Sequence, residues 1–571
     1  MEEIEKILNC SFSRRDRAKM QQTVSYLRLA LKNGRIIMVL PDGMLSADTV
    51  ILNANVITVD PQRPKTEAVA IRDGKFAAVG TTGEIRAFAG PETQVMDLSG
   101  KTVVPGFIDA HLHVLSSGVA HVMAVDCDLR SIGEIQNALR ERAVQTPKGE
   151  WVRGFKFDDT KTSEGRFLRK EDLDAVSVDH PIFVSHRGGH TFFVNSGAFQ
   201  RAGVDRTISD PPGGKFERHC ETGELTGVVQ ERAVEPFSAD MPTPSTDDRR
   251  EGLRRICRMF NAAGLTSVHD AIVRNRDLEV YQAGLASGEL TLRVYALIWH
   301  DHLDDFQKTG LRTGFGNEML RIGGIKMMAD GAIAGRTAWL SEPYVGSADD
   351  FGIRVIEPEE LEEMTQKIHR AGFQVCVHAN GDAAIDMVLT AYEKAMAAHP
   401  RPNPRHRIEH CTVVTPSILE RMAKLGCIAT PFCTYVYYHG EKMRFYGEER
   451  LERMFAQRSF LDYGIVSTGS TDYVPGPYEP LMGIQSCVTR TDSTGNVWGG
   501  NQRITVEEAL RMYTYNGAYA SFEEHVKGSI AVGKLADLVV LGDDPTAVDP
   551  HAIKDILVER TVVGGKTVYE I

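Results

Sequence analysis

Two histidines separated by one residue stand just after an apolar stretch of the chain. The sequence VVPGFIDAHLH ends with His111 and His113. In an extended segment, residues two apart point to the same side, so both imidazoles can meet one cation. Imidazole suits zinc and similar ions, and a catalytic metal keeps one coordination position open for water. Taken alone, this spacing is more often two unrelated polar residues at the end of a strand.

Further candidate ligands occur at or near the ends of later apolar stretches. They are Lys326 in GGIKMMADG, His378 in VCVHANGD, His410 in RIEHC and Asp472 in STGSTD. A (β/α)8 barrel gathers its catalytic groups at the C-terminal ends of its strands. Four histidines, one acid and one lysine that converge by register are hard to obtain by chance. The pattern therefore favours a metal-dependent enzyme.

Eight apolar stretches must supply the strands that position these side chains. Helical patterns separate most of the later ones: in residues 415–426, Thr415 is the expected N-cap, Pro416 the first helical residue and Gly426 the stop. Alternating strands and helices predict an α/β fold, here a (β/α)8 TIM barrel. The predicted strands are residues 102–108, 265–268, 292–298, 322–328, 373–377, 406–408, 427–430 and 464–468.

The ends of the chain differ from this middle part. Residues 48–101 and 525–571 show alternating strands and hairpin turns, which predict one small β-sandwich-like domain built from both chain ends. Residues 1–47 are predicted to be an N-terminal helical extension, because residues 21–32 have helical spacing and Gly34 follows them. The barrel is expected over residues 102–524.

The first two predicted barrel strands are separated by far more chain than one loop and one helix require. We therefore interpret residues 114–264, approximately, as the first barrel helix plus an inserted α/β subdomain. An insertion after a strand lies on the catalytic face of a barrel, where it should act as a lid or a specificity wall.

Composition excludes several classes of protein. The net charge is −12 and no basic stripe is present, which opposes nucleic-acid binding. The nine cysteines are scattered without a CxxC pair, which indicates free thiols in a reducing compartment. The first residues lack the apolar core of a secretory signal, and no stretch is apolar enough for a membrane span. A cytoplasmic protein is expected.

Six motifs together resemble the amidohydrolase superfamily, within it the branch of broad-range metal-dependent hydrolases that includes N-substituted formamide deformylases. The resemblance extends from residue 48 to the C-terminus, and its motifs are less specific for a substrate than for the superfamily. The matching sequences are VVPGFIDAHLH, GGIKMMADGAIAGRTAWL, VCVHANGDAAID, HRIEHC, STGSTD and GSIAVGKLADLVVL.

The resemblance implies a binuclear metal centre, with zinc as the expected metal. His111, His113 and Asp472 would hold one ion, and His378 and His410 the second. Lys326 would join the two ions as an N6-carboxylated (carbamate) side chain. The alternative is a charged Lys326 that binds a substrate carboxylate beside a single metal.

The implied reaction is hydrolysis of a C–N bond in an amide, an N-substituted formamide or a cyclic amide, by a water that the metals activate. Asp472 would transfer the proton to the leaving nitrogen. A heterocycle deaminase with one metal is an alternative, although His378 is followed by AlaAsnGlyAsp without the glutamate that such deaminases carry. A non-catalytic scaffold is a third reading, opposed by the intact ligand positions. Self-association as a homodimer is expected by resemblance alone.

Four further residues are candidates for substrate binding. His190 in RGGHTFF could contact substrate or make a structural hydrogen bond, and Arg336 could anchor an anionic group or close a salt bridge. Tyr435, with Tyr437 and Tyr438, could line the pocket or pack beneath the lid. His269 ends the second strand, where support of a metal ligand is favoured over ligation. Asp382 is expected to cap a helix or to orient His378.

Overall fold

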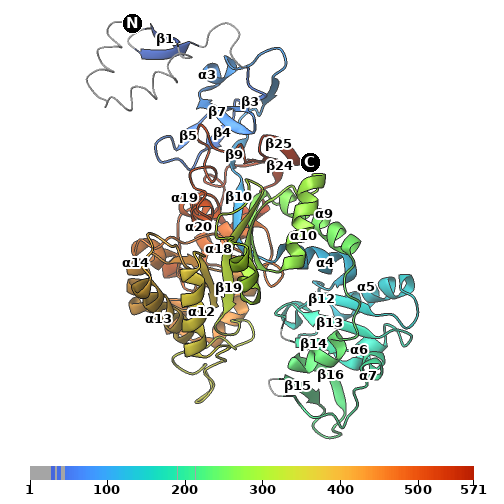
Figure 1. Ribbon diagram of the computed structural model, residues 1–571. Helices are drawn as coiled ribbons and strands as arrows, with labels where there is room; N and C mark the ends of the chain where they lie inside the picture. The colour runs from blue at the N-terminus through green and yellow to red at the C-terminus, as the bar shows by residue number, and fades with distance from the viewer. Residues whose placement is uncertain (1–27, 33–34, 40–45, 190, 212–213) are drawn as a thin grey trace.

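The computed structural model describes residues 28–32, 35–39, 46–189, 191–211 and 214–571 (Figure 1). Its centre is a seven-stranded parallel sheet whose strands follow one another in chain order. This sheet is curved into a nearly closed barrel, so the predicted α/β barrel is confirmed. Its strands are β10 (Phe107–Leu112), β17 (Leu265–Val273), β18 (Arg293–Trp299), β19 (Leu320–Met328), β20 (Val375–Ala379), β21 (Arg407–His410) and β22 (Ile428–Thr430).

An irregular segment, not an eighth strand, closes the barrel between β22 and β10. Residues 464–468, predicted as a strand, make only one ladder-type bridge, from Ser467 to Ala429. The backbone N–H of Thr468 donates to the carbonyl of Ala429 at 3.1 Å, and that of Ala110 donates to Gly469 at 2.9 Å. The segment therefore forms backbone hydrogen bonds with the edges of both neighbouring strands without regular strand pairing.

The first predicted strand, residues 102–108, is divided between two sheets. Thr102–Pro105 forms β9 in a separate sheet, and the barrel begins only with β10. The chain changes sheets at Gly106, where a β-carbon would lie 2.2 Å from the hydroxyl oxygen of Thr266. The single apolar run in the sequence gave no sign of this change, because both strands are buried along their whole length.

Helices cover the outside of the barrel strands. α14 begins at Pro416 after the Thr415 cap and ends before Gly426, as predicted. α4 and α9 cross closely, since a β-carbon on Gly118 of α4 would lie 2.2 Å from the carbonyl oxygen of Gly252 in α9. The principal helices are α4 (Val114–Met123), α9 (Thr246–Ala262), α10 (Asn275–Ser287), α12 (Pro358–Arg370), α13 (Asp382–Ala398), α14 (Pro416–Leu425), α17 (Gln457–Asp462), α18 (Pro480–Thr489) and α19 (Val506–Arg511).

Strands from both ends of the chain meet above the barrel (Figure 1). One sheet has the order β25-β24-β23-β9-β4-β5, and a second has the order β7-β6-β3-β8. Residues of both sheets, such as Ile51, Val103 and Val562, share one buried cluster. The strands are β3 (Thr49–Leu52), β4 (Asn55–Ile57), β5 (Lys65–Thr66), β6 (Ala68–Arg72), β7 (Lys75–Gly80), β8 (Gln94–Asp97), β23 (Leu538–Leu541), β24 (Val558–Val563) and β25 (Lys566–Glu570).

The long connection between β10 and β17 contains its own six-stranded mixed sheet. This sheet lies to one side of the barrel, below α4 in Figure 1, and has separate buried clusters on its faces. The domain limits stated above stay a proposal, which this arrangement supports. The strands, in the order β11-β12-β13-β14-β16-β15, are β11 (Val125–Asp126), β12 (Val152–Phe157), β13 (Ile182–His186), β14 (Thr191–Val194), β16 (Leu225–Glu231) and β15 (Gly214–Arg218).

The predicted helix at residues 21–32 is wrong where it can be compared. Arg28–Lys32 forms β1, an antiparallel partner of β2 (Arg35–Val39). A short hairpin therefore replaces the last turn of the expected helix, and residues 21–27 lie outside the described part. None of the described helices combines the length and the apolar character that crossing a membrane requires. The eight cysteines of the described part are free thiols, as predicted; Cys10 lies outside it.

One buried ion pair fastens the C-terminal strands to the barrel, and we expect its loss to be costly. Arg293 at the start of β18 donates from Nε and Nη2 to the two carboxylate oxygens of Asp537, at 2.7 and 2.8 Å. Asp537→Ala leaves the buried guanidinium without its partner, which costs about 3–5 kcal/mol. The measurement is the free energy of unfolding in urea. Asp462→Ala, which removes an exposed pair with Arg458, should cost less than about 1 kcal/mol; equal losses in both variants would contradict this prediction.

Candidate functional site

One cavity at the C-terminal ends of the barrel strands brings together all six predicted ligands. It has a volume of about 500 Å³. The six side chains that line it come from the ends of four strands, β10, β19, β20 and β21, and from the closing segment. They are His111, His113, Lys326, His378, His410 and Asp472.

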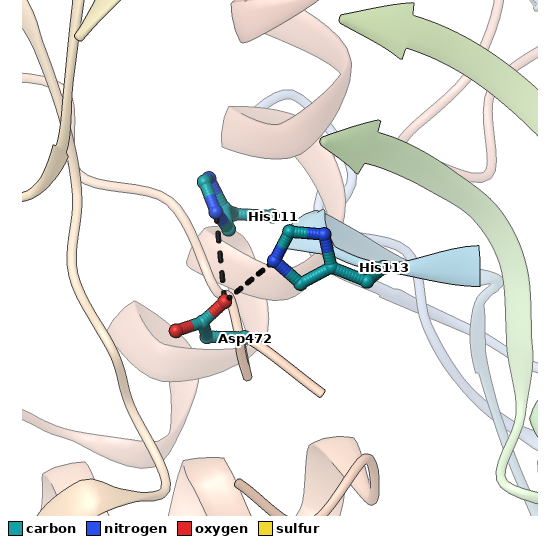
Figure 2. Close-up of side chains that lie close together, drawn as sticks. All are labelled: His111, His113 and Asp472. Carbon is teal, nitrogen blue, oxygen red and sulfur yellow. Dashed lines mark ion pairs between the residues drawn. The ribbon is translucent and has the colours of Figure 1, made fainter. Parts of the chain in front are cut away.

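His111 and His113 converge on Asp472 (Figure 2). Nε2 of His111 lies 3.6 Å from Oδ1 of Asp472, and Nε2 of His113 lies 3.4 Å from the same oxygen. Burial disfavours a charged imidazole, yet the hydrogen bond to Asp472 raises the pKa of His113. The three donor atoms lie within 4.8 Å of one another.

The remaining ring nitrogens of these two histidines are held by acceptors. Nδ1 of His113 donates to the carbonyl of Ala271 at 3.1 Å. Nδ1 of His111 lies 2.5 Å from Oε2 of Glu409, which is completely buried. An acceptor at Nδ1 places the proton there and leaves Nε2 to face the cavity, which is the usual arrangement behind a metal-binding histidine.

His378 and His410 form the other side of the cluster. The centre of the His410 ring lies 4.8 Å from that of His111 and 4.4 Å from that of His378. Nε2 of His378 lies 3.0 Å from the carbonyl oxygen of Gly331, to which Asn380 also donates at 2.9 Å. The four imidazole rings and the carboxylate of Asp472 therefore line a single cavity.

Lys326 ends in the same cavity from β19. Its side chain is 2% exposed, and Nζ has no hydrogen-bond partner among the described residues. Burial lowers the pKa of Lys326 to about 8. A buried ammonium without a partner is unfavourable, so the side chain is suited to a neutral amine or to a chemically modified form.

This donor set fits a divalent metal ion. Imidazole nitrogens and a carboxylate oxygen are the ligands of catalytic zinc and related ions. Two of the imidazoles are already fixed with Nε2 toward the carboxylate. The Lys326 amine has no hydrogen-bond partner among the described residues, which is expected of a side chain that serves as a metal ligand.

Two acids behind the ligands were not singled out by sequence. Asp109 accepts the backbone N–H of His111 at 3.0 Å and the hydroxyl of Thr471 at 2.6 Å, which joins the HxH strand to the segment that carries Asp472. Burial raises the pKa of Asp109 to about 7. Asp330 accepts backbone N–H groups of Asn380 and Gly381 at 2.9 and 2.8 Å, which fixes the turn after His378.

Glu409 is the third residue that sequence reasoning missed. Arg407 donates to it from Nη2 at 2.9 Å and to the carbonyl of Ala110 at 2.5 Å. A signal was available, because an arginine and a glutamate two apart in a buried parallel strand point into the barrel together. Charged side chains there require partners.

The tentative substrate-binding residues have different outcomes. Tyr435 lines the cavity, and its hydroxyl has no hydrogen-bond partner within the described chain. His269 is completely buried with Nδ1 2.9 Å from Nη1 of Arg407, and Arg336 is exposed with its guanidinium over the Phe445 ring, so neither lines the cavity described here. His190 lies outside the described residues.

Asp382 and the other two tyrosines also lie away from the cavity. Asp382 accepts the backbone N–H and the hydroxyl of Ser341, at 2.9 and 2.6 Å, at the beginning of α13. It therefore ties a loop to that helix, whereas Asp330 is the acid nearer to His378, at 3.5 Å. Tyr438 donates to Asp128 at 3.0 Å in the inserted sheet.

The insertion supplies one wall of the cavity. Residues at the C-terminal ends of β12 and β13 and directly after β13 line it, and aromatic residues after β22 complete it. The lining residues from the insertion are Phe155, Lys156, Ser185, His186, Arg187, Gly188 and Gly189.

Comparison with known proteins gives matches along nearly the whole chain. A sequence model of the Amidohydrolase family matches residues 94–569. The N-substituted formamide deformylase of Arthrobacter pascens is 32% identical over 540 residues, which is 92% of this chain and 98% of that protein. YtcJ of Bacillus subtilis (strain 168), provisionally named an amidohydrolase, is 31% identical over 531 residues, or 90% of this chain and 98% of that protein.

Solved structures agree with these matches. The crystal structure of an uncharacterized metal-dependent hydrolase from Pyrococcus horikoshii OT3 is 25% identical, with a TM-score of 0.72. The superposition covers 88% of this chain and 99% of that chain.

We expect the affinity of the site for metal to depend on Glu409. Glu409→Gln keeps the shape of the side chain but removes the charge that holds His111 and Arg407. We expect metal affinity, measured by competition for zinc with a chelator, to fall roughly 10- to 100-fold. Glu393→Gln, which changes an acid paired with Arg421 on the outside of α13, is the matched control. Equal affinities in the two variants would show that His111 does not need Glu409.

Proposed function

Because this chain belongs to the amidohydrolase family of metal-dependent hydrolases, we propose that it hydrolyses a C–N bond in an amide, an N-substituted formamide or a cyclic amide. The observation that carries the proposal is the convergence of four histidines, one aspartate and one unpartnered buried lysine of the described chain on one cavity. The name of the Arthrobacter relative supports the choice of bond.

We assign His111, His113 and Asp472 to one metal ion and His378 and His410 to a second. Lys326 would be a further ligand of this centre as a carbamate, which would form when its neutral amine adds CO2 and loses a proton. The support is the burial of Lys326 and the absence of a hydrogen-bond partner for Nζ in the described part of the structure. Carbamylation would convert an unfavourable buried cation into an anionic oxygen ligand. Zinc is the metal that these ligands suit best.

The bound metals would polarise the scissile carbonyl and lower the pKa of a water. Asp472 accepts a proton from the attacking water and returns it to the leaving nitrogen. The water oxygen forms the new bond to the carbonyl carbon, the C–N bond breaks, and an amine and a carboxylic acid result. Tyr435 contributes its aromatic ring to the wall of the substrate cavity.

The decisive test is the release of an amine and of formate from N-substituted formamides, by protein reconstituted with zinc and bicarbonate. Asp472→Asn should lower turnover by roughly 100- to 10,000-fold, because the proton-transfer group is lost, and should leave measurable metal in the protein. Asp462→Asn, an exposed acid of α17, is the control and should retain full activity. A metal-loaded protein that is inert toward formamides, amides and lactams would refute the proposal.

Metal content tests the role of Lys326 separately. Elemental mass spectrometry should find about two zinc ions per chain after loosely bound metal is removed. Lys326→Ala should reduce this value to one or fewer, because the joining ligand is lost, whereas Lys394→Ala, on the exposed face of α13, should not change it. A value near one in the unmodified protein would reject the carbamate and favour a single-metal enzyme.

A further inference from the structure

Charge is distributed unevenly around the cavity. In addition to Lys326, three cationic side chains line it: Lys156, Arg187 and Lys442. Asp472 is the only carboxylate among the described residues that do so. We call Lys156, Arg187 and Lys442 the basic wall.

The acids that neutralise the basic wall stand behind it. Nζ of Lys156 lies 2.7 Å from Asp126, Arg187 forms an ion pair with Asp128, and Nζ of Lys442 lies 3.3 Å from Asp158. Within the described structure none of these three acids reaches the cavity surface. The cationic ends therefore lie nearer to a bound molecule than their counter-charges do, which makes the potential at this wall positive.

The basic wall adjoins the segment that carries Asp472. Nη1 of Arg187 donates to the carbonyls of Val474 and Pro475, both at 3.4 Å. The ammonium of Lys156 lies 5.6 Å from the centre of the Tyr473 ring. The wall and the proton-transferring carboxylate therefore belong to the same end of the cavity mouth, and one small molecule can contact both.

Some N–H donors of the basic wall have no hydrogen-bond acceptor in the described part of the structure. The side chain of Arg187 is 2% exposed, and its Nε has no hydrogen-bond partner in the described chain. A buried guanidinium N–H without an acceptor is unfavourable. The ammonium of Lys156 has three N–H donors and makes one hydrogen bond within the described part of the chain, to Asp126. An acceptor brought by a ligand would satisfy the remaining N–H donors of Lys156, whose side chain lines the cavity.

Most of the remaining cavity wall is apolar or aromatic. Phe155 from the insertion and Phe432 and Phe455 from the barrel loops line it, and Tyr435 stacks on Phe455 at 4.8 Å between ring centres. Apolar walls with a few placed polar groups favour a ligand whose body is apolar and whose polar end is fixed.

We propose that the natural substrate carries a carboxylate on an apolar body, and that the basic wall binds this carboxylate while the scissile C–N bond faces Asp472. Lys156 supplies N–H donors to the carboxylate, and the fixed charges of Arg187 and Lys442 attract it. This assignment rests on the proposed hydrolysis and names its substrate class.

The kinetic test uses pairs of formamides that differ only at the distant end. N-formyl ω-amino acids of three to six carbons and N-formyl-4-(aminomethyl)benzoate are compared with their primary amides, and formate release alone is followed. The carboxylates should have kcat/KM values roughly 10- to 100-fold above those of the neutral amides. Arg187→Met should remove most of this preference, because it lowers kcat/KM for the carboxylates far more than for the neutral amides.

Two further variants distinguish binding from folding. Lys156→Met should lower the carboxylate preference in the same direction. Lys161→Met is the matched control, because Lys161 pairs with Glu441 at the same contact between insertion and barrel but is absent from the described cavity lining. It should keep the preference of the unmodified protein. A preference that is lost equally in all three variants would mean that the insertion has moved and would overturn the assignment.

A binding measurement separates failure of this assignment from failure of the proposed function. Calorimetry compares dicarboxylates of five to eight carbons with monocarboxylates of equal length on the zinc-loaded protein and on Arg187→Met. Absent formate release with a dicarboxylate preference that Arg187→Met removes would reject the hydrolysis and retain the anion site. Equal hydrolysis of both formamide classes, unaffected by Arg187→Met, would reject the anion site and retain the hydrolysis. Neither formate release nor dicarboxylate preference would reject both.

Discussion

The position of His111 depends on a carboxylate that the barrel holds away from water. Glu409 and Arg407 are both completely buried, and Arg407 donates to Glu409 and to the carbonyl next to His111. Removing an acid and a guanidinium from water costs several kcal/mol for each ion, which only close and numerous hydrogen bonds offset. The same bonds connect the ends of β10, β17 and β21, since His269 lies against Arg407. The orientation of the predicted metal ligand is thus inseparable from the packing of the barrel centre.

Regular strands alone could not deliver every ligand to the cavity. Arg407 and Glu409 alternate with their neighbours and point into the barrel, so an extended His410 would point away from it. His410 instead has φ of 67°, and Asp472 has φ of 50°. Such left-handed conformations cost of order 1–3 kcal/mol each for residues other than glycine. They occur where the chain leaves the barrel edge, and both side chains are thereby turned toward His111.

The sequence was informative where the signal is local. The spacing of His111 and His113 follows from strand geometry, and Lys326 and His378 end apolar stretches that are barrel strands. The sequence was uninformative where the structure depends on residues that are close in space but distant along the chain. Residues 464–468 look like a strand but share only one bridge with β22, and Arg28–Lys32 pairs as a strand despite helical spacing. Glu409 could be suspected from its charge, but its contact with His111 joins residues 298 positions apart.

The cavity wall formed by the insertion could not be read from periodicity, because it depends on how the inserted sheet sits against the barrel. The contact between the inserted sheet and the barrel is polar: Tyr438 donates to Asp128 at 3.0 Å, and Lys161 lies 3.4 Å from Glu441. The helices α4 and α9, which connect the insertion to the barrel, pack closely because Gly118 and Gly252 allow their backbones to touch. All six predicted ligands belong to the barrel, whereas Lys156 and Arg187 belong to the insertion. A change in the contact between the inserted sheet and the barrel would therefore alter which molecules fit the cavity, while the chemistry of the ligands would stay the same. Substrate selectivity can thus vary in this fold without disturbing the buried network on which His111 depends.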